Sequence, residues 1–207
     1  RRTAPIEWRE LEPFGAILLF LRRAPLLPIL TALTAAGIAF AGFRTNLAVF
    51  TRDHFLLGPA GNGVIFTLAG FFAVFTQGVI IRQLGHHLPP RRAALIGCVM
   101  MGVGFFGIAL TPVAWGLYPA VAVIAIGNGL ASPSFSALLS HGVGAGEQGA
   151  LFGATQGVAS LTMIIGPVLA GLLYDVIGQR APYLLGALLL AAAVVALRRI
   201  PDPALAA

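Results

Sequence analysis

The sequence has little charge and no lysine. Only 10% of its 207 residues are charged, against about 25% in an ordinary soluble domain. Hydrophobic residue types make up 58% of the chain, and the mean hydropathy is +0.91. A water-soluble fold could not cover its surface with so few polar side chains. The composition therefore predicts a protein that is solvated by a lipid bilayer.

Cysteine is almost absent, and the long apolar runs hold no Asp, Glu or His and only one arginine, Arg44. The single cysteine, Cys98, excludes an internal disulfide and a cysteine-based metal site, and we expect it to act as a small buried hydrophobe. The four histidines fall between the runs, so we expect no metal and no other cofactor. An intramembrane protease would need a histidine base or paired aspartates inside the runs, so the sequence does not predict an enzyme.

Six apolar runs approach or exceed the roughly 20 residues that a membrane-spanning helix needs. We expect them at about 27–50, 63–81, 93–110, 113–139, 150–174 and 182–197. The fold class predicted is an all-α polytopic membrane protein.

The domain organisation follows from these spans. Residues 14–21 are too short to cross a bilayer, and Trp8, Arg22 and Arg23 flank them. We expect the segment around them to lie as a helix on the membrane surface, with a disordered linker as the alternative. This divides the chain into three parts: 1–26 as a cytoplasmic linker with the interfacial helix, 27–199 as a six-helix transmembrane bundle, and 200–207 as a cytoplasmic tail.

The arginines are distributed unevenly about the six spans. Ten lie on the side that holds both termini, two lie on the opposite side, and Arg44 falls within the first span. Because arginines concentrate in cytoplasmic loops, both termini are expected in the cytoplasm, with the protein in the cytoplasmic (inner or plasma) membrane. Nucleic-acid binding, the other interpretation of a net charge of +6, would require a basic soluble face, so no nucleic-acid partner is expected.

Polarity repeats with a period of three spans. The first and fourth spans are polar, the second and fifth are mixed, and the third and sixth are almost wholly apolar. Because polar side chains avoid lipid, the first and fourth spans should line a pathway, the second and fifth should contact a partner, and the third and sixth should face lipid. A 3+3 inverted repeat of this kind is typical of one half of a transporter.

The fourth span carries a polar stripe at every fourth position, formed by Asn128, Ser132, Ser136 and Ser140. Residues at this spacing share one face of a helix. The stripe is either a hydrophilic wall of a pathway, or a set of hydroxyls that bond to other helices or to their own helix carbonyls. Asn128, Ser132 and Ser136 are accordingly candidate pathway residues.

The fifth span carries small residues instead. Gly149, Gly153 and Gly157 share a face that would let another backbone approach closely. Gly166 and Pro167 should kink the same helix, as a gating hinge or as a static bend. The two amides Gln77 and Gln156, which occupy comparable places in spans two and five, are expected to hydrogen-bond neighbouring helices rather than a ligand. We assign all seven residues to helix interfaces.

Arg44 is the most unusual residue in the spans, because an arginine at the centre of a membrane helix costs about 2.5–3.5 kcal/mol on insertion scales. Together with Asn46 it is a candidate pathway residue. Arg44 could contact an anionic group of a substrate or a carboxylate from another part of the protein. It could also reach the outer surface or pair loosely with Asp53.

Several strings resemble the C-terminal half of major facilitator superfamily transporters, in particular drug:proton antiporters of the tetracycline-efflux type. The stretch GEQGALFGATQGVASLTMIIGPVLAGLLYD, at 146–175, is similar to their eleventh helix, and GNGLASPSFSALLS, at 127–140, is similar to their tenth. The loop after the second span resembles a degenerate copy of the family signature G-x-x-x-D-R-x-G-R-K. Gly78 and Gly85 are in register with its glycines, and Arg82 stands at its acidic position.

The resemblance implies spans seven to twelve of a twelve-helix transporter that works by alternating access. The expected function is secondary active transport of a small molecule, directed to efflux of drug-like or metabolite compounds. The alternative is a non-transporting membrane scaffold or assembly subunit with this fold.

The implied partners are the substrate, the lipid bilayer and an N-terminal six-helix half, either upstream in the same chain or in a second subunit. The basic, polar start of the sequence also suggests part of a longer chain. No Asp, Glu or His lies in a span, so proton coupling would need a titratable group from the other half.

Overall fold

The computed structural model describes residues 26–84 and 88–200, which are folded into helices joined by short turns, with no strand among them. Six helical segments are long and apolar enough to span a membrane, so the predicted all-α fold with six spans is confirmed. The surface helix expected before residue 24 and the tail after residue 200 lie outside the described residues. The helices are α2 (Leu27–Phe55), α3 (Pro59–Phe75), α4 (Ile81–Leu84), α5 (Pro90–Leu110), α6 (Leu117–His141), α7 (Gln148–Val176) and α8 (Ala181–Arg198).

The helix boundaries follow from local chemistry. Proline stands in the first turn of four helices, where its missing N–H has no helical partner to lose. Gly178, between α7 and α8, has a φ of +133°, a conformation that only glycine adopts readily. Pro133 and Pro167 lie within α6 and α7 and end neither helix.

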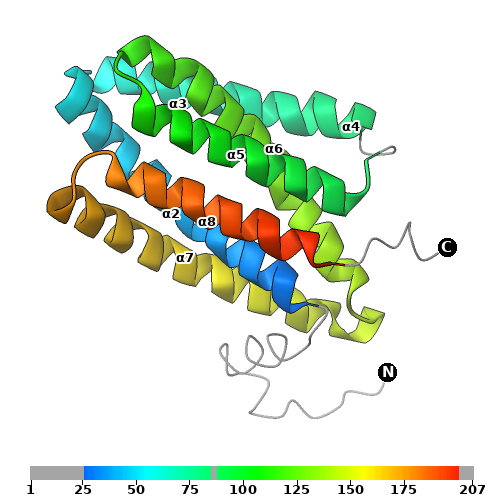
Figure 1. The fold of residues 1–207 in the computed structure, drawn as a ribbon. Coiled ribbons are helices and arrows are strands. Elements are labelled where there is room, and N and C mark those ends of the chain that lie inside the picture. The colour runs from blue at the N-terminus through cyan, green and yellow to red at the C-terminus, as the bar shows by residue number, and fades with distance from the viewer. Residues whose placement is uncertain (1–25, 85–87, 201–207) are drawn as a thin grey trace.

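Packing between the helices shows the inverted repeat. Helix α2 packs against α7 and α8, and α6 packs against α3 and α5. Exchanging the first three spans for the last three converts the α2–α7 pair into α6–α3 and the α2–α8 pair into α6–α5. The remaining large contact, α5–α8, maps onto itself. Figure 1 shows α3 and α7 on opposite edges of the bundle, with the start of α2 and the end of α8 at the same end.

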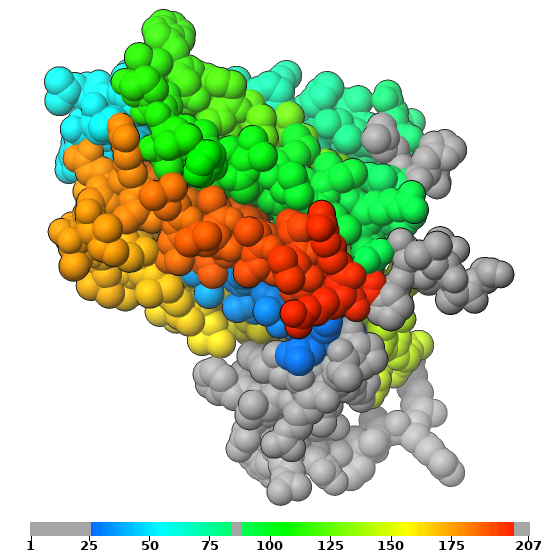
Figure 2. Space-filling view, in the orientation of Figure 1, coloured from blue at the N-terminus to red at the C-terminus, as the bar shows by residue number. Residues whose placement is uncertain are grey.

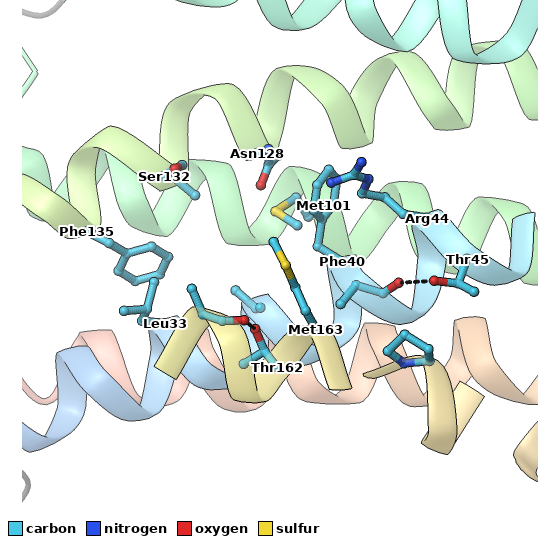
Figure 3. Close-up of a pocket in the computed structure, with 16 residues that line it drawn as sticks. Leu33, Phe40, Arg44, Thr45, Met101, Asn128, Ser132, Phe135, Thr162 and Met163 are labelled. Carbon is cyan, nitrogen blue, oxygen red and sulfur yellow. Dashed lines mark hydrogen bonds between the residues drawn. The ribbon is translucent and has the colours of Figure 1, made fainter. Parts of the chain in front are cut away.

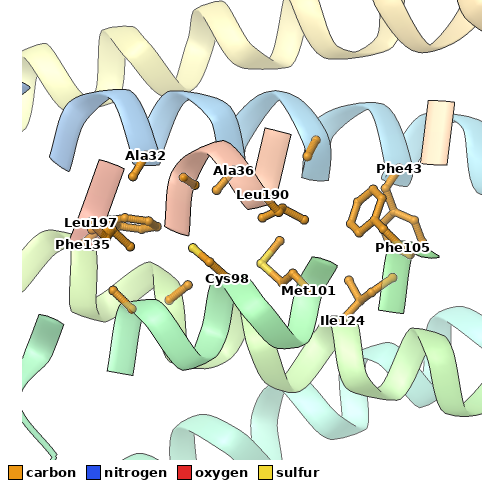
Figure 4. Close-up of a cluster of buried hydrophobic side chains, with 14 of the residues drawn as sticks. Ala32, Ala36, Phe43, Cys98, Met101, Phe105, Ile124, Phe135, Leu190 and Leu197 are labelled. Carbon is orange, nitrogen blue, oxygen red and sulfur yellow. The ribbon is translucent and has the colours of Figure 1, made fainter. Parts of the chain in front are cut away.

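The core lies where α2, α5, α6 and α8 meet (Figure 4). Cys98 and Met101 of α5 are buried there with Ile124 of α6 and Leu190 of α8. Cys98 therefore packs as the small hydrophobe that the sequence indicated.

Helices α5 and α6 approach each other backbone to backbone. A Cβ added at Gly127 would lie 2.6 Å from the carbonyl oxygen of Gly97 and 2.9 Å from the backbone nitrogen of Met101. A side chain at this position would therefore separate the helices. Small residues permit this kind of contact between membrane helices.

The edge helices are much less covered than the centre. In the most apolar stretch of α3, 11% of residues are buried, against 56% in α6 and 22% in α7. The expected contact of these two helices with a partner stays a prediction. Helices α5 and α8 lie side by side (Figure 2), and each also exposes large apolar side chains, among them Val103 and Leu188.

A π-helical turn at Thr76–Ile80 separates α3 from α4, within the span expected at 63–81. The buried hydroxyl of Thr76 donates to the carbonyl of Phe72 at 2.7 Å. Gly129 of α6 packs against it, and a Cβ there would lie 2.8 Å from the Thr76 side chain. Tertiary contact with α6 therefore accompanies this local change of helix type.

Candidate functional site

Two adjoining cavities lie along helices α2, α6 and α7. The first has a volume of about 560 Å³ and the second about 350 Å³. They share four lining residues, Leu33, Ser132, Phe135 and Ala159. We call the combined space the groove, and it extends from Arg44 at one end to Leu151 and Gln156 at the other.

The lining of the first cavity is polar along part of its wall and apolar elsewhere. Its polar side chains are Arg44, Thr45, Asn128, Ser132 and Thr162. Thr45 and Thr162 donate to carbonyls of their own helices, at 3.1 and 2.7 Å. The larger apolar residues are Leu33, Phe40, Met101, Phe135, Met163 and Pro167.

Figure 3 shows how these side chains are arranged. Leu33 and Phe135 lie together at one end, whereas Arg44 and Thr45 lie at the other, with Met101 and Met163 between them. Met101 comes from α5, a span that the sequence assigned to lipid. Its thioether reaches the cavity because α5 packs closely on α6, which the alternation of polar and apolar residues does not reveal.

Arg44 is exposed on the cavity wall, and its guanidinium has no hydrogen-bond or ionic partner within residues 26–84 and 88–200. The suggested pairing with Asp53 is wrong. The carboxylate of Asp53 accepts from Arg52 Nε at 2.8 Å and from the Tyr174 hydroxyl at 3.0 Å. Nine residues separate Arg44 from Asp53, or about 13 Å along the helix, which is too far for a direct contact.

Asn46 is not part of the cavity wall, contrary to the sequence-based assignment. It is only 7% exposed, and its amide nitrogen has no partner among the described atoms. Two residues beyond Arg44, it is rotated by about 200° around the helix and so faces the interior of the bundle. The Tyr183 hydroxyl is a second buried polar group that lacks a described partner.

The polar stripe of α6 divides between the two cavities. Asn128 and Ser132 line the first cavity, and Ser132 and Ser136 line the second. The Ser136 hydroxyl donates to the carbonyl of Ser132 at 3.4 Å, so back-bonding to the helix also occurs within the stripe. The structure therefore brings Arg44, Asn128, Ser132 and Ser136 to one groove.

The predicted interface residues have different surroundings. Gln156 is exposed and lines the second cavity, whereas Gln77 is exposed on the π turn. A Cβ added at Gly149 or Gly153 would meet no described atom within 4 Å. Contact of this face, which includes Gly157, with another helix stays a prediction.

Gly166 differs from those glycines because α2 covers it. A Cβ there would lie 2.7 Å from the carbonyl oxygen of Ile38 and 2.9 Å from the backbone nitrogen of Gly42. Pro167, the next residue, lines the first cavity. The close contact at Gly166 therefore holds α7 against α2 next to the part of α7 that lines the groove.

The signature-like loop is only partly described. Gly78 lies in the π turn, and Arg82 is exposed in α4. Gly85 lies outside the described residues, as do the two histidines after it.

Side-chain contacts connect the helix ends beyond the groove. At one end, a ring nitrogen of His54 lies 2.9 Å from Gln179 Oε1, and the His54 ring stacks on Phe50. His54 thus packs against neighbouring side chains at the end of α2. At the opposite end, Arg91 of α5 donates to the carbonyls of Leu197 and Arg198 in α8, at 3.2 and 3.0 Å.

Comparisons with known proteins show a family and a shared fold. A family model described as Major Facilitator Superfamily matches residues 1–165. Tetracycline resistance protein class E of Escherichia coli is 28% identical over 131 residues, which cover 63% of this chain and 32% of that protein. Tetracycline resistance protein class D of Salmonella ordonez is 29% identical over 166 residues, covering 77% and 41%.

A solved structure shares the fold. The human organic anion transporter MFSD10 (TETRAN) superimposes with a TM-score of 0.81 at 18% identity, over 93% of this chain and 48% of that one. The chain thus spans less than half the length of each of these three proteins.

Proposed function

Because the chain belongs to the Major Facilitator Superfamily, we propose that its six spans form one half of a secondary transporter that moves a small molecule by alternating access. The protein is integral to a membrane, and its relatives point to transport rather than enzymatic catalysis. We propose that transport is outward and that the substrates are drug-like or metabolite compounds, because relatives of the chain are tetracycline resistance proteins.

The observation that carries this proposal is the groove. Two adjoining cavities run along α2, α6 and α7 and combine a polar wall with an apolar one. Sites that bind small molecules are concave and mostly apolar, with a few placed polar groups. A groove of this kind, parallel to helices that cross the membrane, is suited to a transport pathway.

A second six-helix half would complete the pathway. We expect it to contact α3 and α7, whose apolar side chains and Gly149–Gly153 face are uncovered within the described chain. It would also supply any proton-coupling group, because no Asp, Glu or His lines the two cavities. The arginine distribution favours the cytoplasmic (inner or plasma) membrane, with both termini of the chain in the cytoplasm.

The test is to block the groove in the full-length protein. Ser132 lines both cavities, so Ser132→Trp should fill the passage. Leu188→Trp places the same indole at a site on α8 that is 68% exposed and serves as the matched control. The measurement is accumulation of tetracycline in cells that lack their own drug pumps.

We expect the protein and Leu188→Trp to lower accumulation of a probe, and Ser132→Trp to restore it to the level of cells without the protein. Equal activity of the two tryptophan variants would contradict the assignment of the groove. Absence of transport together with a stoichiometric co-purifying partner would favour a scaffold function instead.

A further inference from the structure

We propose that the transported molecule is an amphipathic anion whose charged group binds Arg44 and whose apolar body extends along the groove toward Leu33 and Phe135. This inference rests on the proposed transport function and specifies the substrate class for the same cavity.

The first argument is electrostatic. Arginine remains charged in proteins, and Arg44 is the only charged residue among those that line the first cavity. The acidic residues of the described chain are Asp53, Glu147 and Asp175, and none of them lines either cavity. The wall that this chain contributes is therefore positive, and a carboxylate or similar anion would complement it through charge-assisted hydrogen bonds.

The second argument concerns insertion into the membrane. Arginine within a spanning helix is costly and is retained mainly where it faces a cavity or a partner group. Arg44 is exposed to the cavity instead of being paired within the described part of the chain. Figure 3 shows its side chain extending toward α6, where Asn128 lies on the same cavity wall. Asn128 is thus placed to contact the same head group.

The third argument is the shape of the lining. Arg44 and Leu33 stand on one helix, eleven residues apart, or about 16 Å along its axis. The large apolar side chains between these ends are Phe40, Met101 and Met163. Methionine and aromatic side chains adapt to flat or irregular apolar ligands, so an aromatic or aliphatic body would occupy this stretch.

A carboxylate supplied by another part of the protein could also neutralise Arg44. In that case the guanidinium would stabilise the closed assembly, and its loss would affect every substrate alike. The two explanations differ in whether the effect of Arg44 depends on the charge of the ligand.

The experiment compares three probes that share one ring system: 2-naphthoate, neutral 2-naphthamide and cationic 2-naphthylmethylamine. Binding of each radiolabelled probe to the purified full-length protein is measured for the wild type, Arg44→Gln and Arg44→Lys. Arg180→Gln is the matched control, because Arg180 is exposed in the turn before α8 and lines neither cavity.

We expect 2-naphthoate to bind more tightly than the other two probes. Arg44→Gln should weaken 2-naphthoate binding about tenfold or more, as expected for loss of a hydrogen bond to a charged group. Binding of 2-naphthamide should stay unchanged, Arg44→Lys should retain most of the preference for the anion, and Arg180→Gln should behave as the wild type. The proposal would be overturned if Arg44→Gln weakened binding of all three probes equally. It would also be overturned if the wild type showed no preference for 2-naphthoate or bound none of the probes.

Uptake of the same probes into proteoliposomes separates this inference from the proposed function. Arg44-dependent binding of the anion without uptake would leave the anion site standing and contradict transport. Uptake that is equal for the anion and the amide, and insensitive to Arg44, would support transport and overturn the anion assignment.

Discussion

The contact between α5 and α6 and the outer face of α7 are built from the same residue types, glycine among large hydrophobes, yet their environments differ completely. In the first region, Gly97 and Gly127 bring two backbones together. In the second, a Cβ added at Gly149 or Gly153 would meet no atom of the described chain within 4 Å. A stripe of glycines thus indicates that a backbone can approach, but does not identify which backbone does so.

The largest effect should come from adding a side chain to the packed region. Gly127→Val would push a side chain against backbone atoms of Gly97 and Met101. Overpacking usually costs about 1–3 kcal/mol, and we expect the upper end or more because rigid backbone must move. Gly153→Val, on the open face of α7, should leave the stability of the isolated six-helix unit unchanged.

Unfolding can be followed through Cys98, the single cysteine of the sequence, which is fully buried beside this contact. A thiol-reactive fluorescent dye should label it at a lower temperature in Gly127→Val than in the wild type. Equal destabilisation by Gly153→Val in that unit would show that the face of α7 is not open.

A smaller effect is expected where α7 does contact the bundle. Gly166→Ala would place a methyl group against the backbone of α2 at Ile38 and Gly42, at a cost of about 2 kcal/mol. A Cβ added at Gly171, on the same helix, would meet no described atom within 4 Å, so Gly171→Ala should be neutral. Thermal unfolding tests the pair, and similar melting of both variants would refute a specific α2–α7 contact. Pro167, which lines the cavity, follows Gly166 in the chain. Transport should therefore also fall in Gly166→Ala and not in Gly171→Ala.

The smallest effect should be found at the ends of the helices. Arg91 donates to two carbonyls in the last turn of α8, so Arg91→Gln should destabilise that turn by about 1 kcal/mol. Arg82→Gln removes an exposed arginine of α4 and should leave the stability of the last turn of α8 unchanged. Hydrogen exchange of the amides near Leu197 distinguishes them. Unchanged protection in Arg91→Gln would mean that these bonds do not hold α5 and α8 together.

Much of the fold was predictable because a bilayer imposes simple requirements on sequence. Each span must be long and apolar, which set most helix boundaries to within a few residues. The repeat in polarity anticipated that α2 and α6 contribute lining residues to the groove, whereas contact of α3 and α7 with a partner stays a prediction. The family membership expected from the strings around Gly127 and Gly153 is confirmed.

The site was predictable only in part, because position around a helix depends on packing. Arg44 and Asn128 reach the groove as expected, whereas Asn46, two residues from Arg44, turns into the interior. Met101 was missed since a methionine in an apolar span carries no signal of a cavity. The pairing of Asp53 with Tyr174 joins segments 121 residues apart, and no local pattern encodes such a contact.

The π turn at Thr76–Ile80 lets the segment formed by α3 and α4 hold one more residue than a regular helix of the same length. A π turn holds one residue more than an α turn, so it absorbs a single extra residue without lengthening the helix. Each residue added or removed elsewhere in a helix rotates the rest of that helix by about 100°. The turn therefore helps to set the direction of Arg82 relative to α3. A chain that lost one residue between Gln77 and Ile80 would regain a regular helix with Arg82 on the same side, whereas a residue lost elsewhere in α3 would turn Arg82 by about 100°.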